Sequence, residues 1–137
     1  MVDREVVRRK VASARANLEE AESLAQRSQI TNSKHDRDLA AFYLFLAVQD
    51  AIDLTAHWLA DAGWHPPAEA GEAFDVLAAH EAISGELASA MHGAVGLRNR
   101  IAHGYAGIDH QRIFAELPDG ARHLRAFLVA VAEAAGI

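Results

Sequence analysis

An arginine, a histidine and a tyrosine lie close together in the segment RNRIAHGY, residues 98–105. Arginine keeps its charge at any working pH, and its planar fork of donors matches phosphate oxygens. Histidine titrates near neutral pH. Phosphodiester cleavage needs a base, an acid and a cation that stabilises the developing charge, and Arg98 and His103 suit these roles. A structural reading stays open, in which Arg98 and Arg100 are solvated surface charges and His103 is a hydrogen-bonded residue at a helix end.

The elements that must position this segment are predicted to be helices. The chain has 137 residues, of which 51% are hydrophobic, and this suffices for one core but not for two, so we expect one domain over residues 1–137. Abundant alanine and few prolines favour an all-α fold. We expect about five helices, near residues 3–28, 34–62, 70–80, 84–103 and 110–135, with Gly104 as the residue after the fourth helix and Pro118 interrupting or restarting the fifth.

The cellular location is predicted from what the sequence lacks. It has no cysteine, which agrees with a reducing cytoplasm. The start MVDREVVRRK is charged and is not followed by an apolar stretch, so no signal peptide is expected. The longest apolar run, residues 39–48, is too short to cross a bilayer. We expect a soluble cytoplasmic protein without a membrane partner.

The charges are unevenly distributed along the chain. The net charge is −6, which does not favour nucleic-acid binding by the chain as a whole. No Lys or Arg occurs between residues 38 and 97, so a phosphate ligand must be held by the arginines that follow, possibly with help from the first helix. The acidic block is either a solvated face or a docking surface for a basic partner. The basic residues after the block are Arg98, Arg100, Arg112, Arg122 and Arg125.

A projection of the fourth helix separates two faces. One stripe is predicted to face the core of the domain and consists of Leu87, Ala90, Ala94, Leu97 and Ile101. The opposite stripe consists of His92, Gly96, Asn99 and His103, with Ser89 and Gly93 beside it. A face of small residues permits close approach by another helix, most simply that of a second copy, and we therefore predict a homodimer. In the alternative, the glycines only weaken an exposed helix.

The segment GLRNRIAHGYAGID, residues 96–109, resembles the signature of HepT-like proteins in the HEPN superfamily: an arginine, a histidine a few residues later, then one residue and a tyrosine. Arg98, His103 and Tyr105 fill this pattern, and Asn99 follows the arginine as is usual. RDLAAFYLFLAVQDAIDLTAH (37–57) and EAFDVLAAHEAISGELASAMHGAVG (72–96) are similar to the preceding helices of that family. The resemblance covers nearly the whole chain and implies an up-down helical bundle that dimerises through the motif helix.

The resemblance also implies a function. It indicates a metal-independent endoribonuclease toxin of a type VII HEPN/MNT toxin–antitoxin system, with Arg98 and His103 as catalytic residues in a composite dimer site. Asn99 and Asp53 are supporting candidates, and Arg100 is a candidate for RNA binding. Tyr105 is the expected acceptor of AMP from a cognate minimal nucleotidyltransferase antitoxin, a modification that silences the nuclease. The alternative is a non-catalytic helical partner of a nucleotidyltransferase that binds nucleotide or protein.

Other candidate sites are weaker. No two histidines are three or four residues apart and no Glu-x-x-His pair occurs, so neither a metal nor another cofactor is expected. Asp53 and His57 are four residues apart on the second predicted helix, where a self-satisfied buried pair is the simpler explanation. Trp58 and Trp64 are expected to pack rather than to stack on bases. No DNA partner is expected.

Overall fold

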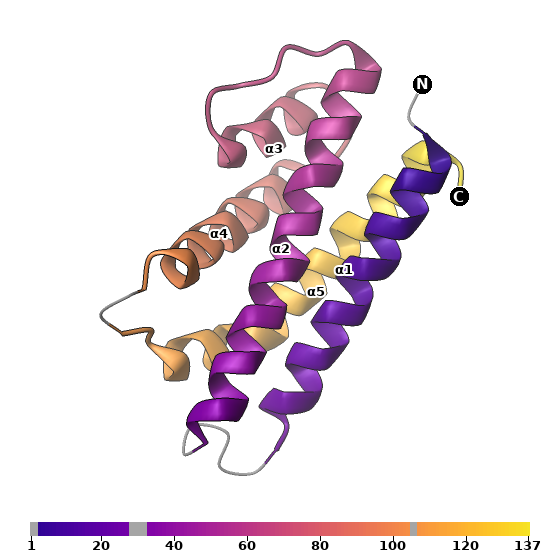
Figure 1. Cartoon of the computed structure of the whole chain (residues 1–137). Coiled ribbons are helices and arrows are strands. Elements are labelled where there is room, and N and C mark those ends of the chain that lie inside the picture. Colours follow the sequence, from indigo (N-terminus) through magenta and orange to yellow (C-terminus); the bar gives the residue numbers. More distant parts are fainter. Residues whose placement is uncertain (1–2, 28–32, 105–106) are drawn as a thin grey trace.

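The computed structural model describes residues 3–27, 33–104 and 107–137. Regular structure in these residues is entirely α-helical and confirms the predicted all-α class (Figure 1). The second and fifth helices begin and end where the sequence predicts, whereas the first ends earlier, at Ala25. The helices are α1 (Arg4–Ala25), α2 (Lys34–Ala62), α3 (Ala70–Ala79), α4 (Gly85–Ala102) and α5 (His110–Ala135).

Short polar side chains fix where four of the helices begin. Asp3, Ser33, Ser84 and Asp109 each precede a helix, and each side-chain oxygen accepts a hydrogen bond from a backbone N–H of the first turn. At the other end of α2, Gly63 adopts a left-handed conformation with φ of 74°, which glycine enters without steric cost. Local chemistry therefore sets these five helix boundaries.

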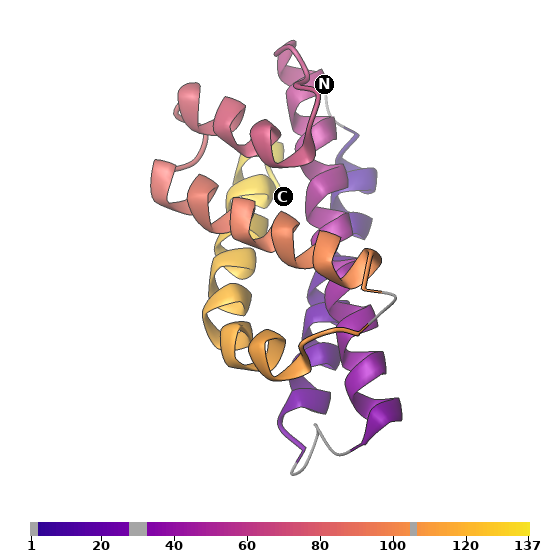
Figure 2. The same ribbon diagram turned by 90° about the vertical axis from the view of Figure 1, so that its left-hand side faces the viewer.

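Helix α2 is the central element of the fold. It contacts each of the other four helices, as its nearly continuous apolar sequence predicts. Helices α1 and α2 form an antiparallel hairpin, α5 runs back beside α1, and α3 and α4 cover the remaining side of α2 (Figures 1 and 2). By length and composition alone α2 could cross a membrane. Its apolar side chains are explained by its central place, because ten of its residues are buried by the surrounding helices.

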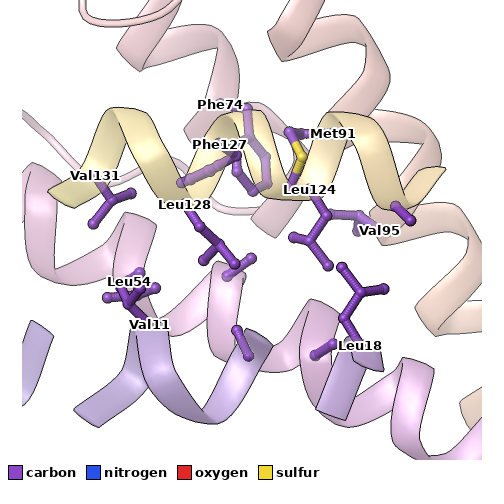
Figure 3. Close-up of a cluster of buried hydrophobic side chains, with 14 of the residues drawn as sticks. Val11, Leu18, Leu54, Phe74, Met91, Val95, Leu124, Phe127, Leu128 and Val131 are labelled. Atoms are coloured by element: carbon purple, nitrogen blue, oxygen red, sulfur yellow. The ribbon is translucent and has the colours of Figure 1, made fainter. Parts of the chain in front are cut away.

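One continuous core joins all five helices (Figure 3). Phe74 of α3 and Phe127 of α5 are fully buried and meet edge to face, with ring centroids 5.2 Å apart. Leu18 of α1, Leu54 of α2 and Met91 of α4 belong to the same buried cluster. Burying each of these large side chains contributes about 2 kcal/mol of transfer free energy, so the core fixes the position of α4 relative to α2.

The predicted interruption of the fifth helix at Pro118 is wrong. Helix α5 continues through Pro118, whose ring is exposed to solvent. A proline inside a helix removes one backbone hydrogen bond and favours a bend rather than necessarily ending the helix. Figure 2 shows that α5 bends in its N-terminal part, and this bend brings the start of the helix under the end of α4.

Candidate active site

Helix α4 carries the predicted motif, and its buried face differs from the projection. The buried residues of α4 are Ala88, Met91 and Val95, whereas the predicted core stripe is only partly buried throughout, at Leu87, Ala90, Ala94, Leu97 and Ile101. The predicted core stripe is therefore only one edge of the surface of α4 that packs against the other helices. This surface is wide because α4 packs against α2, α3 and α5 at once. Arg98 follows Val95 by three residues and continues the buried row.

The side chain of Arg98 turns toward α2. Its Nη1 donates a hydrogen bond of 2.9 Å to Oε1 of Gln49, and its Nε is buried without a hydrogen bond to any described residue. Gln49 in turn donates from Nε2 to Oδ1 of Asp53 at 3.1 Å. Arginine has only donors and a carboxylate only acceptors, so these two partners fix the orientation of the Gln49 amide.

A lysine from α1 continues this network. Lys10 Nζ lies 3.0 Å from Asp53 Oδ2 and 3.6 Å from Asp50 Oδ1. The hydrogen bond to Asp53 raises the pKa of Lys10 above its ordinary value, against the opposing effect of desolvation. Asp50 is 9% exposed, so Lys10 supplies the positive charge that this buried carboxylate requires. The network thus links α1, α2 and α4 from Lys10 to Arg98.

His103 lies at the end of α4 and faces solvent. It is the C-cap residue, and its backbone N–H donates to the carbonyl of Asn99 at 3.0 Å. Gly104 directly follows the C-cap of α4, as the sequence predicts, but it does not have the positive φ that often favours glycine there. A close approach explains this glycine: a Cβ atom there would lie 2.8 Å from the carbonyl oxygen of Arg100.

A cavity of about 340 Å³ adjoins His103 between the end of α4 and the start of α5. Arg100 and Arg112 line it, and both contact Glu116, at 3.3 and 2.9 Å. The other two arginines of the C-terminal group lie apart from the cavity, since Arg122 pairs with Asp119 and Arg125 with Glu22 of α1. The cations beside the motif are therefore Arg98, Arg100 and Arg112.

The outward stripe of α4 is exposed as predicted at Asn99 and His103, with Gly96 half-buried. His92 differs, because its ring is engaged by α3. Its Nε2 lies 2.7 Å from Asp75 Oδ2, and the ring passes so close to Gly71 that a Cβ atom there would be 2.8 Å from His92 Nδ1. The open part of the stripe thus begins after His92.

The remaining candidates are distributed as follows. Tyr105 lies outside the described residues. Asp53 contacts Lys10 and Gln49, and His57 is exposed. The prediction of a buried Asp53–His57 pair is therefore wrong. Both tryptophans pack, as expected: Trp58 lies against Phe127, and Trp64 stacks on His80 with centroids 4.0 Å apart.

The sequence-based prediction missed Gln49. It is a polar residue within the apolar second helix and lies four positions before Asp53, a spacing at which Gln–Asp hydrogen bonds form on a helix. That spacing could have identified it as a partner of Asp53. Its contact with Arg98 joins residues 49 positions apart and depends on how α4 crosses α2.

Solved structures with this fold include toxins in complex with antitoxins. A toxin–antitoxin structure with AMP-PNP matches with a TM-score of 0.88 and 17% identity, over 94% of this chain and 98% of the other. The tri-AMPylated HEPN toxin of Shewanella oneidensis in complex with MNT antitoxin matches with a TM-score of 0.88 and 19% identity, over 97% and 99%. The cytosolic protein YutE of Bacillus subtilis, of unknown function, matches with a TM-score of 0.83 and 12% identity, over 96% and 90%.

Comparison of the sequence with curated proteins and with protein-family models shows to which family the chain belongs. No curated protein sequence matches the chain significantly. The family model described as Ribonuclease HepT-like matches residues 14–131, which include the motif at the end of α4 and the α2 residues that contact it. Since this match extends over most of the sequence, the chain belongs to the HepT-like ribonuclease family.

Proposed function

We propose that this protein is a metal-independent endoribonuclease that acts as the toxin of a toxin–antitoxin pair in the cytoplasm. The observation that carries the proposal is the presence of a fixed cation, Arg98, and an exposed imidazole, His103, at the same end of α4 in a HepT-like chain. Arginine binds phosphate, and histidine transfers protons near neutral pH. Together they supply the functional groups that RNA cleavage requires, in one domain spanning residues 1–137.

In the proposed reaction, a neutral His103 removes the proton from a ribose 2′-hydroxyl. The 2′-oxygen attacks the adjacent phosphorus, and the bond from phosphorus to the 5′-oxygen breaks, leaving a cyclic phosphate. A second proton donor in the composite cleft returns a proton to the departing 5′-oxygen. Arg98 stabilises the charge on the phosphate, Asn99 orients the phosphate or His103, and Arg100 binds the flanking RNA backbone.

The proposed homodimer brings two copies of α4 together. Support comes from the open surface of this helix: a Cβ atom at Gly93 would meet no atom within 4 Å, and one at Gly96 would only reach the side chain of Arg100. Phe42 of α2 is 52% exposed and lies two turns before Gln49, on the same side of the helix. Burying these surfaces against a second copy would place both His103 residues in one cleft.

Tyr105 is the proposed point of control. A cognate minimal nucleotidyltransferase would catalyse attack of the tyrosine hydroxyl on the α-phosphate of ATP, with release of pyrophosphate, so that AMP becomes attached to Tyr105. A structurally similar protein is described as a tri-AMPylated HEPN toxin bound to an MNT antitoxin, which supports this assignment. Attached AMP adds bulk and negative charge next to His103 and would repel RNA.

The proposal is tested with purified protein and a mixed pool of single-stranded RNA. The parent is expected to cleave RNA in the presence of EDTA, whereas His103→Ala and Arg98→Ala lose about 100-fold or more of this activity. His57→Ala removes an exposed histidine from α2 and serves as the matched control with parental activity. Cleavage by His103→Ala at the parental rate would contradict the catalytic assignment.

Two further outcomes address partner and modification. A folded, dimeric parent protein that binds the nucleotidyltransferase but leaves RNA intact would favour the alternative, a non-catalytic binding partner. Mass spectrometry after coexpression with the nucleotidyltransferase is expected to find AMP on Tyr105 in silenced protein. Unmodified Tyr105 in protein that the antitoxin has fully silenced would instead indicate inhibition by complex formation.

A further inference from the structure

The polar network behind Arg98 assigns a role to Gln49 in α2. Arg98 donates to Gln49 Oε1 at 2.9 Å, and Gln49 Nε2 donates to Asp53 at 3.1 Å. The amide therefore stands between a cation and an anion. We infer that Gln49 is a positioning residue, which holds the guanidinium of Arg98 in place without neutralising its charge; this inference rests on the proposed function.

Charge distinguishes an amide from a carboxylate at position 49. A carboxylate on residue 49 would also accept the hydrogen bond from Arg98, but it would form an ion pair with the guanidinium and compete with phosphate for it. The Gln49 amide carries no net charge. Asp53 is satisfied by Lys10 at 3.0 Å, so its negative charge is compensated on the side away from Arg98.

Burial makes the restraint effective. Arg98 is half-buried, and its Nε is buried without a hydrogen bond to a described residue, so the Gln49 contact determines which way the planar group faces. Beyond Gln49 and Asp53, Lys10 also lies 3.6 Å from Asp50, which is 9% exposed. The far end of the network is therefore anchored on a residue that cannot easily rotate into solvent.

Two variants of Gln49 separate the orientation of Arg98 from its charge. Gln49→Leu keeps a side chain of similar size but removes both hydrogen bonds, whereas Gln49→Glu keeps an acceptor for Arg98 and adds a negative charge. Gln26→Leu and Gln26→Glu are matched controls, because Gln26 is exposed at the end of α1 and does not belong to the network from Lys10 to Arg98. Circular dichroism and thermal unfolding establish that each variant remains folded before its activity is compared.

The first readout is NMR of the arginine side chains in the full-length protein, with the Arg98 signals assigned by their loss in Arg98→Lys. In the parent, the hydrogen bond to Gln49 slows rotation of the guanidinium and gives separate Nη signals. Gln49→Leu is expected to average them, whereas Gln49→Glu and both Gln26 variants leave them separate. Separate Nη signals in folded Gln49→Leu would overturn the restraint.

The second readout is steady-state cleavage of a fluorescent single-stranded RNA. Misplacement of a catalytic group by about 1 Å costs up to about 100-fold, so Gln49→Leu is expected to lower kcat/KM by about 10- to 100-fold. Gln49→Glu is expected to raise KM by about tenfold, because its carboxylate competes with phosphate. Parental kinetics in both Gln49 variants would overturn the inference while leaving the proposed function intact. A parent that does not cleave any RNA would overturn the proposed function, and with it the inference.

Discussion

Arg98 and His103 leave the same end of α4 in different directions: the Arg98 guanidinium is 2.9 Å from Gln49 of α2, whereas the His103 ring is exposed at the C-cap. Residues five positions apart are separated by about 140° around a helix axis. The Arg98 cation and the His103 imidazole of one chain therefore lie on different sides of α4. This divergence is the physical reason to expect that a complete site combines groups from two copies.

The first prediction is that inactive variants complement each other. In a mixed dimer of Arg98→Ala and His103→Ala, one site contains Arg98 from one protomer and His103 from the other, and the second site contains neither. Coexpressed and isolated as a tagged heterodimer, this mixture is expected to recover up to about half of the activity of the parent. Cleavage of fluorescent RNA measures the recovery.

Each variant as a homodimer is the control, and both are expected to be inactive. A heterodimer as inactive as the two homodimers would mean that Arg98 and His103 must come from the same chain, or that all four groups are required at once.

The second prediction concerns the small-residue face of α4. Gly96→Gln removes the cost of a helical glycine, which is about 0.5–1 kcal/mol, but it places a long side chain on the proposed dimer surface. We expect weaker association by at least about tenfold, measured by analytical ultracentrifugation. Gly120→Gln on α5 is the matched control, since it gains the same helix propensity at an exposed site with no atom within 4 Å of the added Cβ. Equal association of the two variants would indicate that Gly96 only weakens an exposed helix.

The third prediction concerns Lys10, whose ammonium compensates Asp50 and Asp53. Lys10→Met is expected to lower the free energy of unfolding at neutral pH by about 1–2 kcal/mol, less than for a fully buried pair because the Lys10 side chain is 35% exposed and partly screened by solvent. The hydrogen bond to Asp53 raises the pKa of Lys10, so this contribution persists at neutral pH and is lost only as the pH rises through the raised value. Urea unfolding measures the difference.

Lys34 provides the control for Lys10, because it is 79% exposed and pairs with Asp38 within the first turn of α2. Lys34→Met is expected to cost under about 0.5 kcal/mol. A loss as large as that of Lys10→Met would mean that the burial of Asp50 adds nothing to the Lys10 pair.

The fourth prediction is a pH dependence at the start of α2. The hydrogen bond from Lys34 lowers the pKa of Asp38, and the nearby His110 acts in the same direction. Because the folded-state pKa lies below the unfolded value near 3.8, the stabilisation is fully present above that value and is lost as the pH falls through the lowered one. The parent and Lys34→Met should therefore differ in unfolding free energy at about pH 7 and converge below about pH 3. A constant difference at both values would contradict the pairing.

The sequence predicted the helices well because their boundaries depend on local chemistry. Ser84 caps the start of α4, and Gly63 ends α2. Both act through contacts with residues close to them in the chain, which can be predicted from the amino-acid sequence. The surroundings of Arg98 were not predictable in this way. Its partner Gln49 is 49 residues distant, and the contact exists because α4 crosses α2 at that point. The projection of α4 likewise located the exposed Asn99 and His103 but underestimated how many neighbours bury the other side.

The fifth prediction concerns Gly104, next to the proposed catalytic histidine. A Cβ atom on this residue would lie 2.6 Å from Cγ1 of Ile108 and 2.8 Å from the carbonyl oxygen of Arg100. The isoleucine side chain can rotate, but the carbonyl belongs to the last turn of α4 and cannot move without shifting the His103 backbone. Gly104→Ala is therefore expected to lower the free energy of unfolding by about 1–3 kcal/mol and to reduce RNA cleavage.

Gly85→Ala is the matched control, since it lies at the other end of α4 and an added Cβ meets no atom within 4 Å. It is expected to leave stability unchanged or slightly higher, because alanine favours the helix by up to about 1 kcal/mol. Urea unfolding and RNA cleavage are compared for both variants. If Gly104→Ala is as stable and as active as Gly85→Ala, the close approach to the Arg100 carbonyl does not constrain the end of α4, and the position of His103 does not depend on a glycine there.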